Sequence, residues 1–493
     1  MLLPEGLARL ITLGRLIRRL SRLLKPALLA YLIYAFILGV LVFASPAPRS
    51  SDYIENINPT RFLAESEGPD RVILVEENDF ARRSRFSLLA GAERTLDIAQ
   101  HQINNDSTSL LFYGFLFDAA DRGVHVRLLI DGFFHRFQDD HRQTLYALIN
   151  HPMIDVRFYE PFTLSRPWTW NNRFHSKLLI VDSSMAVVGG RNTGDRYFSS
   201  DRADSYYVAD RDVILINTEP QSSSASVLND IGLYFDDVWN HDCVVALAGD
   251  LADWQTQQGR QRHEFLLKLV KDHVQDDVSF PQDADDWQEI SMPARKISVI
   301  SNPIGPFLKE PRVLAELSQI MKAAESKIVI QSPYVVKTRQ MSRYFSFDKL
   351  NAAEVTILTN SIAASPNLAA ISGYANKRRD IASQVDHLYE YQGNGSLHGK
   401  SYIIDDRLSI IGSFNVDARS SFLSSEIVVV IDSKPLARSI QNKIGHLTRQ
   451  SLLVSEDGTY KADTRIEQRP VSWPKNIIVK FLSISLYFFD FML

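Results

Sequence analysis

The chain of 493 residues contains a single cysteine, Cys243. One cysteine can form neither an intramolecular disulfide nor a cysteine-rich zinc or iron–sulfur site, so both are excluded whatever the compartment. The expected role of Cys243 is that of a small buried apolar side chain. Hydrophobic residues make up 45% of the sequence, and this share predicts folded domains held together by packed cores.

A net positive charge is also lacking outside one segment. The formal net charge is −4, but residues 1–25 carry six basic residues against Glu5, a net +5 that leaves −9 for the remainder. A body with this balance lacks the cationic field that draws a polyanion to a protein surface. Nucleic acid is therefore not expected as a partner.

Charge is absent altogether from the nineteen residues at 27–45, ALLAYLIYAFILGVLVFAS. At about 1.5 Å per residue this stretch spans about 28 Å of hydrocarbon, so we predict a transmembrane anchor over 26–45. Leucines and isoleucines alternate with arginines in 1–25, as in a basic amphipathic helix at a membrane surface. The basic side stays in the cytoplasm, which places the rest of the chain on the outer side. A signal peptide cleaved after Ala44 and a buried core helix are the alternatives.

The length of the chain favours two domains with attachments. After a polar linker at 46–70, two passages repeat the order strand, helix, strand, strand. This repeat predicts an α/β fold of two similar lobes, each a mixed sheet flanked by helices, packed with pseudo-twofold symmetry. The expected boundaries are lobe 1 at 71–245, a helical connector at 246–293, lobe 2 at 294–455 and an apolar C-terminal tail at 456–493.

Each passage ends in one copy of the motif H-x-K-x4-D-x6-G-[GS]-x-N. The copies occupy 175–192 and 398–415 and align without a gap, with matching apolar positions between the motif residues. Such agreement does not arise by chance. The motif residues are His175, Lys177, Asp182, Gly189 and Asn192 in the first copy and His398, Lys400, Asp405, Gly412 and Asn415 in the second.

The histidine and lysine of each motif stand two residues apart on a run typical of a strand. Side chains at that spacing leave the same face, so both can reach one phosphate. Lysine offers a charge and three donors to a phosphate oxygen, and histidine can act as nucleophile or general acid/base. Covalent phosphoryl transfer needs a nucleophile on one side of phosphorus and a proton donor on the other. We therefore expect the lobes to face one another across a single cleft, with neither active alone.

The paired motifs resemble the HKD signature of the phospholipase D superfamily. The flanks GGRNTGDRYF at 189–198, YFDDVWN at 234–240 and GSFNVDARSSFLSSE at 412–426 are similar to those of bacterial cardiolipin synthases of the phospholipase D type. The resemblance implies a two-step exchange, in which one histidine attacks a phospholipid phosphorus and the other activates an incoming alcohol or water. It implies neither a metal nor a cofactor.

The same resemblance assigns roles within the motifs. His175 is the expected nucleophile and His398 the expected acid/base. Ser413 should add a hydroxyl to the phosphate site from the second lobe only, because Gly190 replaces it in the first. The residues expected on phosphate oxygens are Lys177, Lys400, Asn192 and Asn415.

Four acidic residues have supporting roles in this scheme. Asp182 and Asp405 are expected to hold the local loops without touching substrate. A carboxylate on the strand after each motif is expected to fix the tautomer of an imidazole. For that role the sequence offers Glu426 and Asp212, with Asp210 as a rival of Asp212.

The expected function is that of a phospholipid transphosphatidylase that transfers a phosphatidyl group, through a phosphohistidine, to the hydroxyl of phosphatidylglycerol. Phosphatidylethanolamine is a second candidate substrate, and the need for a protein partner stays open. The alternatives are a phospholipase D that hydrolyses phospholipid to phosphatidic acid and a phosphodiesterase or nuclease with the same two histidines. The expected location is the bacterial inner membrane, with one pass, a cytoplasmic N-terminus and a periplasmic catalytic body.

Two further segments carry no motif. HRFQDDH at 135–141 groups histidines and aspartates, but polar clusters after a strand are usually exposed loops, and no metal site is expected there. Residues 477–493 are almost wholly apolar. They either pack onto the body or make a second membrane contact beside the active site.

Overall fold

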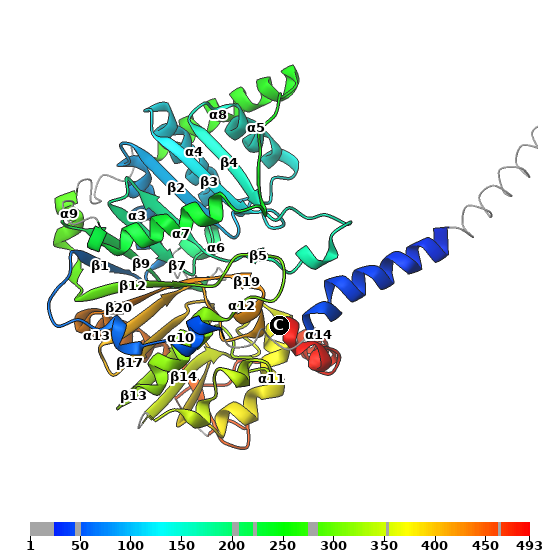
Figure 1. Ribbon diagram of the computed structural model, residues 1–493, viewed down its shortest axis with the longest axis vertical. Coiled ribbons are helices and arrows are strands. Elements are labelled where there is room, and N and C mark those ends of the chain that lie inside the picture. The colour runs from blue at the N-terminus through cyan, green and yellow to red at the C-terminus, as the bar shows by residue number, and fades with distance from the viewer. Residues whose placement is uncertain are drawn as a thin grey trace, which may run out of the picture.

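The computed structural model describes residues 24–44, 51–199, 207–219, 224–274, 284–351, 354–461 and 465–493. The described chain forms two α/β lobes stacked on one another, with the first lobe uppermost in Figure 1. This arrangement confirms the predicted fold class. Most of the basic segment expected at 1–25 lies outside the described residues.

Lobe 1 is built on a nine-stranded sheet in the order β10-β4-β3-β2-β6-β7-β9-β1-β11. The neighbours β2, β3 and β4 are parallel, whereas β6, β7, β9 and β1 pair antiparallel. The strands are β1 (Asp70–Val75), β2 (Thr95–Gln100), β3 (His125–Asp131), β4 (Ile154–Tyr159), β6 (Leu178–Val181), β7 (Met185–Gly189), β9 (Asp212–Asn217), β10 (Val244–Ala246) and β11 (Met292–Pro293). The helices are α3 (Asn78–Ala90), α4 (Ser107–Asp121), α5 (Arg142–Asn150), α6 (Asp195–Phe198), α7 (Val227–Trp239), α8 (Asp253–Val274) and α9 (Ala284–Glu289).

Lobe 2 has an eight-stranded sheet in the order β12-β20-β18-β17-β13-β14-β15-β21, which repeats the order of lobe 1 once β11 is set aside. Its strands are β12 (Lys296–Ser301), β13 (Lys327–Gln331), β14 (Glu354–Asn360), β15 (His387–Tyr391), β17 (Ser401–Ile404), β18 (Leu408–Gly412), β20 (Ile427–Asp432) and β21 (Ser451–Val454). Its helices are α10 (Arg312–Lys322), α11 (Leu368–Ala382), α12 (Ala418–Phe422), α13 (Lys434–Thr448) and α14 (Trp473–Ser485).

Short helical turns join these elements. They are η1 (Leu41–Ala44), α2 (Asp52–Glu55), η2 (Pro59–Phe62), η3 (Asp139–His141), η4 (Pro167–Thr169), η6 (Met341–Arg343), η7 (Phe347–Lys349) and η8 (Leu486–Met492). The α2 and η2 turns belong to the segment expected as a linker, and they dock on lobe 2. Phe62 is fully buried in the lobe 2 core, and Tyr53 and Arg61 both bond Glu316.

The apolar alternation of the strands explains why the lobes stay together. In β9, Ile214 and Ile216 face the core of lobe 1, whereas Val213 and Leu215 face the other way. Val213 and Leu215 of β9 pack together with Val429 of β20 in one buried apolar cluster that both lobes share. Side chains on one strand alternate between the two faces of its sheet. One face of each sheet therefore packs in the core of its own lobe, and the other face packs in the cluster that the two lobes share.

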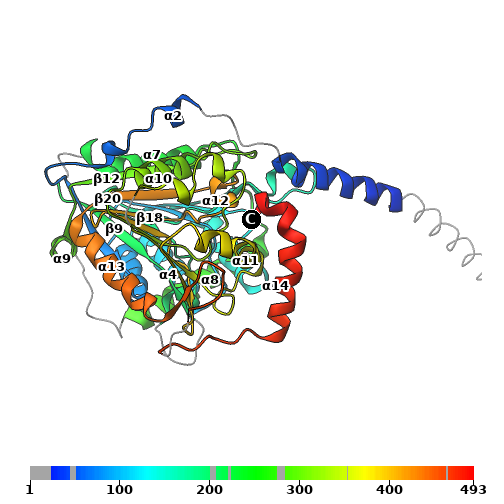
Figure 2. The ribbon, with the colours of Figure 1, turned by 90° about the horizontal axis from the view of Figure 1, so that it is seen from below.

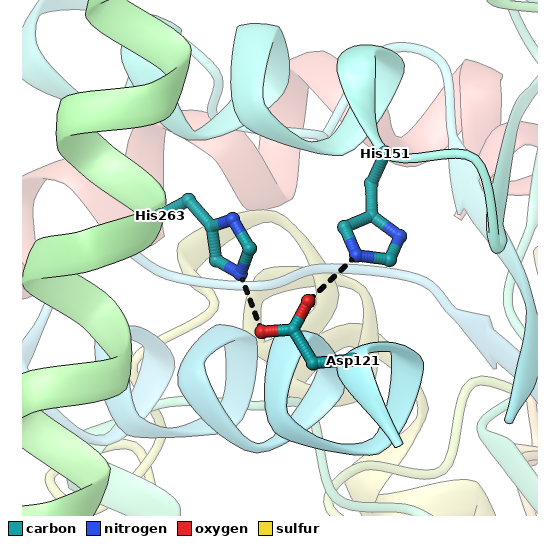
Figure 3. A group of neighbouring side chains, drawn as sticks. All are labelled: Asp121, His151 and His263. Atoms are coloured by element: carbon teal, nitrogen blue, oxygen red, sulfur yellow. Dashed lines mark hydrogen bonds and ion pairs between the residues drawn. The ribbon is translucent and has the colours of Figure 1, made fainter. Parts of the chain in front are cut away.

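The helix α8 lies in the segment expected as a connector and packs on α4 and α5 of lobe 1. Asp121, at the end of α4, accepts from His151 Nε2 and from His263 Nε2 of α8, at 3.0 Å each (Figure 3). The main-chain N–H of Met153 lies 3.2 Å from His151 Nδ1, so that nitrogen is an acceptor and the proton is on Nε2. A histidine that binds a metal through Nε2 carries its proton on Nδ1 and donates from that nitrogen, which is the opposite tautomer. The three side chains therefore form a hydrogen-bonded clasp that holds α8 in place.

The candidate membrane span is the helical segment Leu24–Ala44, which projects from the body in Figures 1 and 2. Its C-terminal half is tied to a loop of lobe 1, because Tyr34 Oη donates to the carbonyl of Ser165 at 2.7 Å and Asn171 Nδ2 to that of Gly39 at 2.7 Å. Its length and composition are sufficient to cross a bilayer, as the sequence predicts.

The C-terminal helix α14 packs on α11, and the turn η8 that follows it lies beside the body-proximal end of the candidate span in Figure 2. Its buried side is narrow and centres on Val479, 3% exposed. The opposite side carries large apolar residues that remain open to solvent, namely Ile477, Phe481 and Ile484, and Phe488 in the following turn η8 continues this surface. The tail thus packs on the body with one side and presents an apolar surface with the other.

Glycine in α4 provides a test of how tightly α8 is docked. A Cβ at Gly114 would lie 2.6 Å from Val270 Cγ2 and 2.8 Å from the carbonyl oxygen of Leu266, whereas a Cβ at Gly232 in α7 meets nothing within 4 Å. Gly114→Ala should lower the free energy of unfolding by about 1–3 kcal/mol through overpacking. Gly232→Ala should raise it by about 0.5–1 kcal/mol through helix propensity. Urea unfolding of both variants measures the difference, and two changes of the same sign would contradict this packing.

Candidate active site

Two pairs of short strands join the lobes at the point where the motifs begin. β5 (Arg173–Phe174) of lobe 1 pairs in parallel with β19 (Ser424–Ser425) of lobe 2. β16 (Ser396–Leu397) of lobe 2 pairs in the same way with β8 (Val208–Ala209) of lobe 1. Each motif histidine follows such a strand, and its main-chain N–H donates to the other lobe: His175 to Ser425 O at 3.1 Å and His398 to Ala209 O at 2.7 Å. The backbone therefore brings both histidines to one line of contact between the lobes, formed by the β5–β19 and β16–β8 pairs and called the seam below.

The same seam sets a carboxylate of the opposite lobe behind each imidazole. His175 Nδ1 lies 3.0 Å from the carboxylate of Glu426, and His398 Nδ1 lies 2.5 Å from Asp210 Oδ2. A carboxylate that accepts from Nδ1 fixes the tautomer and leaves Nε2 as the reactive nitrogen. Because these pairs cross between the lobes, neither lobe alone contains an oriented imidazole.

The assignment of Asp212 is corrected by the strand register. Gly189 of the first motif pairs with Asp212, whereas the equivalent Gly412 pairs with Val428, so the equivalent of Glu426 is Asp210. Asp212 is buried and accepts from Arg85 Nη2 and Arg191 Nη1, at 2.8 Å each. Its carboxylate holds two arginines inside lobe 1 and touches neither imidazole.

The two carboxylates differ in acidity. Burial alone would raise the pKa of Asp210, but the charges of His398 and Lys400 outweigh it and hold that pKa well below its usual range. Burial raises the pKa of Glu426 to about 7, although Lys177 opposes the rise. At neutral pH Asp210 is therefore a fixed anion, whereas Glu426 can carry a proton.

The imidazoles and lysines share a desolvated, cationic environment. Burial and Lys400 lower the pKa of His398 to about 4, and burial and Lys177 hold that of His175 well below its usual range. Burial lowers the pKa of Lys177 to about 7 and that of Lys400 to about 8. The lysine side chains fold back so that each Nζ donates to the carbonyl of its motif histidine at 2.5 Å. Within the described residues neither lysine has an ion-pair partner, so the site favours an anion between the lobes.

The two motif asparagines are placed alike but are not free. Asn192 Nδ2 donates to Tyr197 Oη at 3.0 Å and Asn415 Nδ2 to Ser420 Oγ at 3.4 Å. Each amide nitrogen keeps a second N–H, so phosphate binding by these residues stays a prediction.

Ser413 is occupied by its own strand. Its hydroxyl accepts from Ile427 N at 3.0 Å and lies 3.2 Å from Ile427 O. It also lowers the pKa of Glu426, so in this structure it supports the carboxylate and not an open phosphate site. At the equivalent Gly190 a Cβ would lie 2.4 Å from Asp210 Oδ1, so glycine there makes room for the other carboxylate.

The motif aspartates lie at the opposite ends of the motif strands, as loop supports. Asp182 accepts from the main-chain N–H groups of Glu93, Arg94 and Thr95 at 2.7–2.9 Å. Asp405 repeats this with three consecutive N–H groups at 325–327. Both adopt a positive φ of about 50°. These contacts agree with the supporting role expected for them.

A cavity of about 460 Å³ opens beside His175. Its polar wall includes His101, Arg173, Arg419 and Glu426, and its apolar wall consists of Phe133, Phe134, Phe162 and Trp170. The ring centroids of His101 and His175 are 5.0 Å apart. Sequence reasoning missed His101 because the register of β2 and β13 aligns it with Pro333, so the duplication gave no signal.

This arrangement can carry out displacement at a phosphodiester. One Nε2 can attack phosphorus while the other imidazole moves a proton on the opposite side, and the lysines can neutralise the equatorial oxygens. The chemistry needs no group beyond these side chains.

Comparison with known proteins agrees with this geometry. The family model described as "Cardiolipin synthase, PLD-like domain" matches the chain twice, over 86–217 and 317–448. The chain therefore belongs to the phospholipase D-like family of cardiolipin synthase domains.

Individual relatives share most of the chain. Cardiolipin synthase C of Escherichia coli is 29% identical over 412 residues, which cover 75% of this chain and 83% of the relative. Cardiolipin synthase 2 of Staphylococcus epidermidis is 23% identical over 388 residues, 74% of this chain and 66% of the relative. The crystal structure of phosphatidylserine synthase of Haemophilus influenzae superposes with a TM-score of 0.58 at 13% identity, over 86% of this chain and 95% of that one. That likeness shows a shared fold.

The two neighbouring aspartates of lobe 1 separate catalysis from stability. Asp210→Asn should lower turnover about 10⁴-fold through the wrong imidazole tautomer, with little change in the unfolding transition. Asp212→Asn should destabilise the fold by about 3–5 kcal/mol, because it leaves Arg85 and Arg191 buried without a counter-charge. Turnover of a chromogenic phosphodiester and thermal unfolding measure the two effects. The reverse pattern, with Asp212→Asn stable but inactive, would restore the earlier assignment.

Proposed function

We propose that this protein is a phospholipid transphosphatidylase, similar to a cardiolipin synthase, that transfers a phosphatidyl group to the hydroxyl of phosphatidylglycerol. The observation that carries the proposal is the pair of imidazoles, each backed by a carboxylate of the other lobe, beside two buried lysines that form no ion pair with any described residue. Relatives named cardiolipin synthases that cover most of the chain support the choice of substrate.

The reaction runs through two in-line displacements. In the first, an imidazole Nε2 forms a bond to phosphorus, and the headgroup alcohol leaves with a proton supplied by the other imidazole. In the second, the acceptor hydroxyl gives a proton back to that imidazole and attacks phosphorus, and the phosphorus–nitrogen bond breaks. Lys177 and Lys400 stabilise the charge on the non-bridging oxygens in both steps.

Two alternatives use the same histidines. Water in place of the alcohol gives a phospholipase D that releases phosphatidic acid, and a polynucleotide in place of the lipid gives a nuclease. The aromatic wall of the cavity and the apolar surface of α14 favour a lipid over a polyanion. The acidic balance of the chain favours it too, because nucleic acid binding depends on clustered positive charge.

The proposed location is the bacterial inner membrane, with the span Leu24–Ala44 crossing once and the catalytic body in the periplasm. The exposed apolar side of α14 supports a second contact, at the membrane surface beside the span. The aromatic ring of Phe36 in the span lies 6.4 Å, centroid to centroid, from that of Phe489 in η8, so the span meets the turn that follows α14. Such a surface would hold the cleft close to the headgroups.

The nature of the product is the first test. Purified, detergent-solubilised protein is incubated with labelled phosphatidylglycerol, with and without phosphatidylethanolamine, and the lipids are identified by mass spectrometry. We expect cardiolipin with glycerol or ethanolamine as the released alcohol, and none from His175→Ala or His398→Ala. Phosphatidic acid as the sole product would identify a hydrolase instead. Cleavage of single-stranded DNA without lipid turnover would identify a nuclease.

The orientation can be tested with engineered cysteines in a Cys243→Ser background, in spheroplasts treated with an impermeant maleimide. Gly249 is exposed with nothing within 4 Å of its Cβ position, so Gly249→Cys should be labelled from the periplasmic side. Phe488 is 77% exposed in the structure, so only a membrane would protect Phe488→Cys until detergent is added. Labelling of Gly249→Cys only after lysis would reverse the orientation. Immediate labelling of Phe488→Cys would remove the membrane contact of α14.

A further inference from the structure

The cavity beside His175 contains an arginine that no acidic side chain neutralises. Arg419, in α12, donates through Nη2 to Asn171 Oδ1 at 3.3 Å and to Met492 O at 3.1 Å. No carboxylate forms an ion pair with it among the residues that the structure describes. Its charged neighbour Asp417 is engaged as the N-cap of α12 through Ser420 N at 2.6 Å. A partly buried guanidinium in this state favours an anion from outside the protein.

The other arginine in the cavity wall is already neutralised. Arg173 donates to Asp131 at 3.1 Å and to the carbonyls of Glu160 and Thr169 at 2.8 and 3.2 Å. Arg173 is therefore neutralised by Asp131, although its buried Nε has no hydrogen-bond partner, and Arg419 is the arginine of this wall that has no ion-pair partner among the described residues.

His101 adds a hydrogen-bond acceptor to the same cavity. Its Nδ1 lies 2.7 Å from the carbonyl of Phe174 and must be the protonated nitrogen, because a carbonyl only accepts. Burial and the charge of Lys177 hold the pKa of His101 well below its usual range, so the ring is neutral. Its Nε2 therefore presents a lone pair, and no described residue donates to it. A hydroxyl group satisfies such an acceptor next to His175.

Arg419 favours an anion and His101 favours a hydroxyl, so the cavity suits a ligand that carries both groups. We propose that the cavity is the binding site of the acceptor phospholipid, with Arg419 paired to its phosphodiester and His101 accepting a hydrogen bond from the glycerol hydroxyl that does not react, while the reacting hydroxyl faces His175. This inference rests on the proposed transphosphatidylase activity and deepens it. The exposed rings of Phe133 and Phe162 lie at the cavity and face outward, where acyl chains would pass.

The pseudo-twofold counterpart in lobe 1 does not form such a site. Arg196 stands four residues after Asn192, as Arg419 stands four after Asn415. Arg196 is exposed, donates to Tyr197 Oη at 3.1 Å and lies over the Tyr197 ring. Among the residues that the structure describes, the two ends of the cleft are thus unlike, and the His175 end is the one that presents an arginine suited to an anionic alcohol.

This asymmetry reverses the roles expected for the two histidines. An acceptor at the His175 end passes its hydroxyl proton to His175, attacks phosphorus from that side and breaks the bond from phosphorus to His398 Nε2. The different charge states of the two carboxylates agree with His398 as the nucleophile and His175 as the acid/base. Asp210, a fixed anion, stabilises the positive charge on a substituted His398, whereas Glu426 can share the proton that His175 gains and loses.

Arginine variants test the phosphodiester contact. Purified enzyme is supplied with one labelled donor and two acceptors, phosphatidylglycerol and free glycerol. Arg419→Gln should raise the KM for phosphatidylglycerol at least tenfold and leave the use of glycerol within twofold. Arg419→Lys should recover part of the loss, and the counterpart Arg196→Gln should change neither. Equal losses with both acceptors, or an effect of Arg196→Gln as large as that of Arg419→Gln, would overturn the assignment.

His101 is tested by the partition between transfer and hydrolysis. His101→Phe should lower the ratio of transfer product to phosphatidic acid at least fivefold with either acceptor, while release of the first alcohol continues. A residue that only supports the fold would change both products together, and that result would remove His101 from the site. Wild-type enzyme that makes only phosphatidic acid with every alcohol would defeat the transphosphatidylase proposal itself, which keeps the two failures distinct.

The covalent intermediate tests the direction. A phosphatidyl donor with a p-nitrophenol leaving group needs no acid in the first step, so His175→Asn should still react once and then accumulate the adduct. Proteolysis and mass spectrometry should place the phosphatidyl group on the peptide that contains His398. In the wild type, an adduct trapped on the His175 peptide would overturn the placement of the acceptor at the His175 end of the cleft.

Discussion

The active site depends on two exchanged strand pairs at the seam between the lobes. β5 with β19, and β16 with β8, carry a motif histidine of one lobe to the carboxylate-bearing turn of the other. The main-chain bonds fix the positions of the Cα atoms, so the pairs of His175 with Glu426 and His398 with Asp210 follow from backbone geometry. The shared apolar cluster behind the seam makes this alignment rigid.

The two motif lysines dominate the electrostatics around the imidazoles. Lys177 and Lys400 are buried beside imidazoles whose pKa values they depress. In a low-dielectric site these two lysines favour an anion and, further along the reaction, the charge of the transition state. Burial also keeps the attacking imidazole neutral and therefore nucleophilic at physiological pH, whereas the imidazole that acts as the acid needs a proton that it shares with its carboxylate partner.

The sequence predicted the features that a repeat or a local pattern carries. The supporting role of Asp182 and Asp405 followed from the family resemblance, whereas the two motifs, the succession of strands and helices along each lobe and the apolar span were visible in residue spacing. Partners from distant segments were not: the choice between Asp210 and Asp212 depends on how β9 pairs with β7, and the crossing of carboxylates depends on lobe packing. His101 lacks a counterpart in the repeat. The docking of α8 on lobe 1 depends on a close approach at Gly114 that composition does not reveal.

The crossing of the carboxylates has a consequence for biogenesis. During synthesis the first lobe emerges while Glu426, which orients its histidine, is 251 residues further along the chain. A nascent molecule with only that lobe folded holds no imidazole in a reactive tautomer. Lipids around an emerging chain are thus safe from premature attack until the last sheet has closed.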